Sequence, residues 1–157
     1  IEDMGAWLAE FMRAAGVEKR DDLRAMLAEC DFVSLHMVLT PETRSLIGPA
    51  EFVAMKPSAF LINVSRGALI DEPALVAALE TGRIAGAGLD VFAHEPLALE
   101  GHPLSRLYAM ENVILSPHLT FYTAEAMRRL EDETLERCFE ILEGRAVRVK
   151  SKDPRLA

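Results

Sequence analysis

An arginine, a glutamate and a histidine each come shortly after an apolar segment of this sequence. Arg66 follows "AFLINV", Glu95 follows "GLDV" and His118 follows "VILS". A guanidinium offers a planar fork of N–H donors that binds a carboxylate at two points, and a histidine exchanges protons near neutral pH. A carboxylate beside the histidine would orient the ring and favour its protonated form. The trio suits the interconversion of a 2-keto acid and a 2-hydroxy acid, and Gly67 would let a ligand approach the backbone.

The apolar segments before these residues are typical of buried parallel strands. Short apolar runs occupy residues 31–35, 59–64, 83–91 and 112–116, and helical patterns lie between and after them. The alternation predicts an α/β fold, with a parallel sheet and flanking helices. Ligands bind outside the carboxyl ends of the strands in such sheets, so the trio would lie along one edge.

The predicted helices carry their own start and stop signals. We expect helices over about residues 2–17 and 21–28, a helix opened by Pro49, one with Asp71 as N-cap that ends at Gly82, and a long one over residues 123–143. The first helix places Met4, Trp7, Leu8, Phe11 and Met12 on one face. The apolar residues of the last helix predict core packing that can include a subunit contact.

Composition narrows the function classes. The net charge of −8 argues against a nucleic-acid or anionic-membrane surface, and no apolar run reaches the ~20 residues that span a bilayer. Cys30 and Cys138 lie far apart, without C-x-x-C spacing, which favours a reducing cytoplasm. No histidine has a partner at metal-ligand spacing, so we expect no metal site. "GAGLDV" does not complete the glycine fingerprint of dinucleotide-binding turns, and its small residues would let helices pack closely on the strand.

Each member of the trio also has a structural interpretation. An arginine after a strand is often a solvated charge, a glutamate in a polar loop almost always is, and His118 after Pro117 could cap a turn. Their common position at the strand ends brings the functional interpretation level with the structural one, and position alone does not decide between the two.

Three stretches resemble one known family in the right order. "LHMVLTPETR" (35–44), "MKPSAFLINVSRGALIDEPALVAALETGRIAGAGLDVFAHEP" (55–96) and "NVILSPHLT" (112–120) are similar to the D-isomer-specific 2-hydroxyacid dehydrogenases, in the second half of their NAD-binding domain. "HLTFYTAEAM" (118–127) is similar to the D-lactate dehydrogenase branch. The resemblance implies a partial Rossmann-like domain over residues 1–157, with the N-terminal catalytic domain and the first βαβ unit absent.

The resemblance also implies roles for individual residues. Arg66 would bind the substrate carboxylate and carbonyl, His118 would be the general acid/base, and Glu95 would pair with that histidine. Arg66, Asp90 and the backbone around Val64 and Ser65 would face the nicotinamide end of the cofactor. The adenosine side would be contacted by Met37, Val38 and Thr43, although the family usually has proline where this chain has Val38.

The implied protein is a cytoplasmic oxidoreductase that transfers a hydride between NAD and a small 2-keto or 2-hydroxy acid, and NADP stays open. A chain with half of the cofactor domain should be nearly inactive alone, because hydride transfer needs a cofactor held on both halves. Two alternatives remain: a non-catalytic, nucleotide-sensing interaction module, and an inactive remnant. Uncovered apolar faces such as that of Trp7 and Phe11 predict a homodimer.

Overall fold

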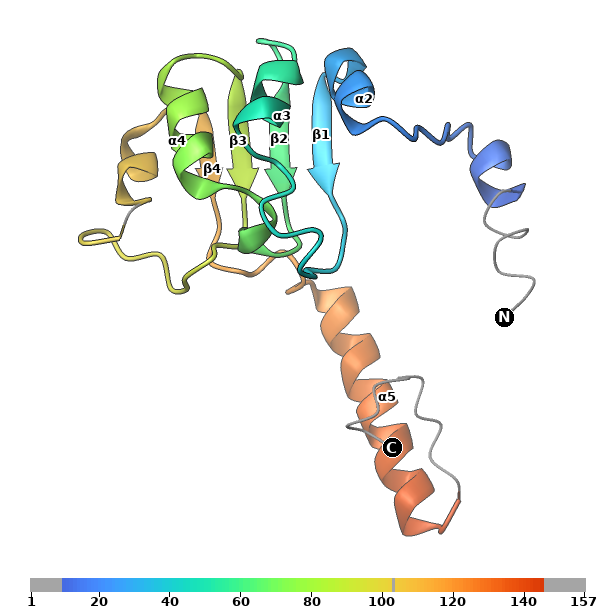
Figure 1. The fold of residues 1–157 in the computed structure, drawn as a ribbon. Coiled ribbons are helices and arrows are strands. Elements are labelled where there is room, and N and C mark those ends of the chain that lie inside the picture. The colour runs from blue at the N-terminus through green and yellow to red at the C-terminus, as the bar shows by residue number, and fades with distance from the viewer. Residues whose placement is uncertain (1–9, 103, 146–157) are drawn as a thin grey trace. The chain divides into compact units, whose positions relative to one another are not determined.

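The computed structural model describes residues 10–102 and 104–145, which form a parallel sheet with helices and a long separate helix (Figure 1). Its strands are β1 (Phe32–Leu35), β2 (Phe60–Asn63), β3 (Gly86–Leu89) and β4 (Val113–Leu115). Its α-helices are α2 (Leu23–Glu29), α3 (Pro49–Ala54), α4 (Glu72–Glu80) and α5 (Ala124–Leu142). The chain separates into two compact units, one up to Pro117 and one from His118 onward.

The sheet has the order β1-β2-β3-β4, and every neighbouring pair is parallel. The register pairs Phe32 with Phe60 and Phe60 with Gly86. All four carboxyl ends therefore lie at one edge of the sheet, which confirms the predicted α/β class. Strand β3 is shorter than the predicted run of residues 83–91. Residues 83–85 form a bend instead, and the side chain of Arg83 donates a hydrogen bond to the carbonyl of Met55 at the end of α3.

One face of the sheet carries the apolar core. Alternate residues of the strands are buried beneath α3 and α4, including Leu35, Leu61 and Leu89 (Figure 1). The opposite face keeps Phe32 and Ile114 exposed at 68% and 76%. Successive side chains point to opposite faces of a strand, so the strands, which were predicted to be buried, are buried on one face only among the described residues.

The predicted helix signals are confirmed where the structure describes them. Asp71 accepts a hydrogen bond from the Ala74 N–H at 3.0 Å as the N-cap of α4, and Gly82, with φ of 65°, follows its end. Pro49 is the first residue of α3. Residues 10–14 are helical, and Phe11 among them is exposed. The residues at positions 4, 7 and 8 of the proposed apolar face lie outside the described part of the chain.

The long helix α5 differs from expectation. Thr123 caps its start by accepting from the Ala126 N–H at 3.1 Å, as its sequence position suggests. Its apolar side chains are exposed rather than part of a core, however: Leu130, Leu135 and Phe139 are each more than half exposed. The core packing predicted for this helix is therefore wrong for its described apolar side chains, and the predicted subunit contact stays a prediction.

Candidate active site

Arg66 lies at the carboxyl end of β2, where the chain turns into the short 3-10 helix Gly67–Leu69. Its side chain is exposed, and its Nη1 donates to the carbonyl of Ser65 at 2.6 Å. The Ser65 hydroxyl donates to the carbonyl of Leu35 at the end of β1, at 2.8 Å. The turn that carries Arg66 is thus fastened to the neighbouring strand end.

Gly67 has a different role from the predicted one. A Cβ on this residue would lie 1.9 Å from the carbonyl carbon of Phe92 and 2.2 Å from the amide nitrogen of Ala93. Gly67 is buried, so the space beside it is filled by the chain's own backbone and not by a ligand. Its missing side chain brings the turn of Arg66 into contact with the segment that leads to Glu95.

Glu95 and Asp90 follow β3 on that segment. The Glu95 carboxylate accepts a hydrogen bond from the Phe92 N–H at 3.0 Å, although the residue as a whole is exposed. Asp90 is only 2% exposed, and its N–H donates to the carbonyl of Asn63 at 3.0 Å. The structure therefore brings the Arg66 turn and the Asp90 to Glu95 segment together at neighbouring strand ends.

The loop after β1 carries the three residues predicted to contact adenosine. The Thr43 hydroxyl donates to the carbonyl of Val38 at 2.9 Å and accepts from the Thr40 N–H at 2.7 Å, so Thr43 and Val38 are held together. Val38 is 77% exposed and Met37 is 38% exposed. In the same loop, a hydrogen bond from the Thr40 side chain lowers the pKa of Glu42.

His118 begins the second unit and directly follows Pro117. Its φ of 59° lies in the left-handed region that side-chain-bearing residues rarely adopt, and such positions cluster at functional sites. Its ring makes an edge contact with Phe121, with ring centres 6.4 Å apart. His118 and Glu95 belong to different units, and their pairing is a prediction.

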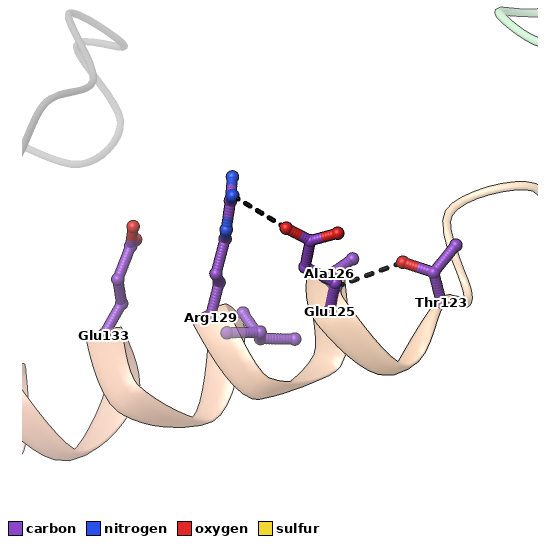
Figure 2. Close-up of a pocket in the computed structure, with 6 residues that line it drawn as sticks. Thr123, Glu125, Ala126, Arg129 and Glu133 are labelled. Atoms are coloured by element: carbon purple, nitrogen blue, oxygen red, sulfur yellow. Dashed lines mark hydrogen bonds and ion pairs between the residues drawn. The ribbon is translucent and has the colours of Figure 1, made fainter.

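Two further observations bear on other kinds of site. Among the described residues, no group of three histidine, cysteine or acidic side chains is arranged to hold a metal ion. A shallow hollow runs along α5, lined by Thr123, Glu125, Ala126, Arg129, Leu130 and Glu133 (Figure 2). Glu125 and Arg129 pair with each other there at 3.1 Å, and none of the candidate residues lines this hollow.

One residue of the turn was missed in the sequence. Asn63, the last residue of β2, is fully buried, and its side-chain amide hydrogen-bonds to the backbone of Ser65 and Arg66. The available signal was a lone amide at the end of an apolar run, directly before the Arg66 turn.

Comparison with known proteins identifies the family. A family model described as "D-isomer specific 2-hydroxyacid dehydrogenase, NAD binding domain" matches residues 9–120. D-3-phosphoglycerate dehydrogenase from Synechocystis sp. is 47% identical over 123 residues, which are 78% of this chain and 21% of that protein. Glyoxylate reductase from Thermococcus litoralis is 50% identical over 105 residues, 67% of this chain and 30% of that protein.

Solved structures agree with this family. The structure of D-lactate dehydrogenase with NAD+ from Lactobacillus jensenii has a TM-score of 0.76 and 36% identity, over 83% of this chain and 42% of that one. The structure of D-mandelate dehydrogenase from Rhodotorula graminis has a TM-score of 0.79 and 32% identity, and the match covers 92% of this chain and 41% of that one. The chain thus spans less than half the length of these relatives. It belongs to the family of D-isomer specific 2-hydroxyacid dehydrogenase NAD binding domains.

Proposed function

We propose that this chain is part of the cofactor domain of an enzyme that transfers a hydride between NAD(H) and a small 2-keto or D-2-hydroxy acid. The observation that carries the proposal is the placement of an exposed guanidinium, Arg66, beside the Asp90 to Glu95 segment at the carboxyl edge of a parallel sheet. Family membership supports the same reaction class, and the relatives' names include glyoxylate reductase and D-lactate dehydrogenase.

The residues of this edge fit the nicotinamide end of NAD. The buried residue Asp90 and the partly exposed residues Val64 and Ser65 lie at this edge, and they would supply the donors and acceptors that a carboxamide needs. The cofactor, when bound, supplies the hydride. NADP is also compatible with these residues, and a related D-isomer specific 2-hydroxyacid dehydrogenase from Xanthobacter autotrophicus Py2 was solved with NADPH. Met37, Val38 and Thr43 would contact the adenosine side.

The substrate would be anchored and protonated by this chain's own side chains. Arg66 would bind the carboxylate through its fork of N–H donors and polarise the neighbouring carbonyl. His118 would donate a proton to the oxygen that becomes the hydroxyl, and Glu95 would keep that imidazole oriented and protonated. The left-handed backbone of His118 supports a functional constraint at this position.

The assay is NADH oxidation by the full-length natural protein with glyoxylate, pyruvate and hydroxypyruvate. H118Q should lower kcat by about 10²- to 10⁴-fold while NADH still binds, because only proton transfer is lost. H102Q is the matched control, since His102 hydrogen-bonds within its own loop, to the carbonyl of His94 at 3.0 Å. Full activity in H118Q, or no turnover of any 2-keto acid by the wild type, would refute the proposal.

We further infer a cytoplasmic homodimer. Free thiols at Cys30 and Cys138 support a reducing compartment.

The exposed apolar side chains of Phe32 and Ile114 on the sheet support an association surface. Among the described residues, no helix is long and apolar enough to span a bilayer. Light scattering of the 157-residue chain should give twice its mass of 17.4 kDa, and a monodisperse monomer would overturn the dimer.

A further inference from the structure

Asn63 is an amide at the end of an otherwise apolar strand. It has no exposed surface, and burying an amide is costly unless its donor and acceptor are both satisfied. Both are: Nδ2 donates to the carbonyl of Arg66 at 3.0 Å, and Oδ1 accepts from the N–H of Ser65 at 3.1 Å. An apolar residue would fill the same space without this cost, so the amide serves the turn that follows it.

The contacts of Asn63 converge on the residue that we propose as the substrate anchor. Its side chain binds the N–H of Ser65 and the carbonyl of Arg66, one backbone group of each residue, and its own backbone carbonyl accepts from the N–H of Asp90 at 3.0 Å. One residue thus holds the Arg66 turn and the start of the segment that carries Glu95. No other described contact joins the Arg66 carbonyl to a side chain.

We infer that Asn63 is a positioning residue, which sets the Arg66 guanidinium for two-point binding of the substrate carboxylate. The inference rests on the proposed function and extends it to a residue that does not itself touch substrate. Aspartate at this position keeps the acceptor for Ser65 but loses the donor to Arg66, whereas alanine loses both. Because a misplacement of about 1 Å can cost 10²-fold, even the isosteric change should weaken anion binding.

The test uses the full-length natural protein with NADH bound and oxamate as the probe, a non-reacting mimic of a 2-keto acid. N63D and N63A should raise the Kd of oxamate by about 10- to 100-fold. The Kd of NADH should stay within about threefold. In an R66Q background, N63A should produce no further loss, because the effect acts through Arg66.

The matched control is N112A. Asn112 also donates its amide to a backbone carbonyl, that of Ala85 at 3.0 Å, but it lies before β4 at the opposite edge of the sheet. N112A should lower stability without changing the Kd of oxamate.

Three outcomes overturn the positioning role: an unchanged oxamate Kd in N63D and N63A, an equal loss of NADH affinity, or failure of both variants to fold. A wild-type protein that binds NADH but not oxamate would instead overturn the proposed function.

Discussion

Gly67→Ala is the substitution with the most sharply defined steric consequence in this chain. The added Cβ would lie 1.9 Å from the Phe92 carbonyl carbon and 2.4 Å from its Cα. Ordinary van der Waals contact begins near 3.4 Å, so the two backbones must separate by about 1.5 Å. Both contacts are with main-chain atoms, which cannot rotate away as the end of a flexible side chain could.

The expected cost is at the upper end of the range for overpacking, about 3 kcal/mol in the free energy of unfolding. For a chain of this size that corresponds to a fall in Tm of roughly 6–12 °C. A separation above 1 Å between the Arg66 turn and the Glu95 segment should also lower kcat/KM by about 10²-fold in the full-length protein.

Urea unfolding followed by circular dichroism measures the stability, with Gly88→Ala as the matched control. Gly88 also lies in the sheet unit, on β3, but its added Cβ would meet only the Ile62 side chain, at 3.9 Å. G88A should therefore change stability by less than about 1 kcal/mol. If G67A unfolds at the same urea concentration as G88A, the backbone of Phe92 does not lie as close to Gly67 as described, and the prediction fails.

Three further predictions concern stability. Burial by itself would raise the pKa of Glu51, but the hydrogen bonds from Arg24 and from the Gly48 N–H, together with the charge of Arg24, lower it overall. E51Q should therefore lower the free energy of unfolding by about 1 kcal/mol at pH 7. Urea titrations should show that the difference between E51Q and the wild type shrinks as the pH falls below 4.5, because the carboxylate of the unfolded chain already takes up a proton there. A difference that grows in acid would contradict this. D71A removes the N-cap of α4 and should lower the unfolding free energy by about 1 kcal/mol, whereas D71N should retain most of it. G86A would place a Cβ 2.4 Å from the Asn112 carbonyl oxygen and should lower Tm well beyond the effect of G88A, and equal melting of the two would refute it.

The sheet could be predicted from the sequence because each strand is a short apolar run followed by a chain reversal. The four predicted segments each contain an observed strand, and no strand end differs from the predicted one by more than three residues. Helix ends were predictable at Asp71 and Thr123, where the capping side chain is a local signal. Local signals of this kind do not depend on distant parts of the chain.

Features set by contacts between distant segments were not predictable. The 3-10 helices Gly67–Leu69 and Ser105–Ala109 have no periodic pattern, and the bridge between Ile47 and Ile70 joins segments far apart in sequence. The glycines were misinterpreted for the same reason: Gly67 and Gly86 accommodate neighbouring backbone, whereas a sequence shows only the missing side chain. The buried amide of Asn63 was likewise masked by its apolar neighbours.

The central claim is that the exposed guanidinium of Arg66 binds the carboxylate of a 2-keto acid. The most direct measurement compares kcat/KM of the full-length protein for pyruvate and for methyl pyruvate, in the wild type and in R66Q. The wild type should have the higher kcat/KM for the free acid. In R66Q that preference should fall about 10- to 100-fold, because the substitution removes the charged hydrogen bonds to the carboxylate. An R66Q enzyme that keeps the wild-type preference for the free acid would contradict the account.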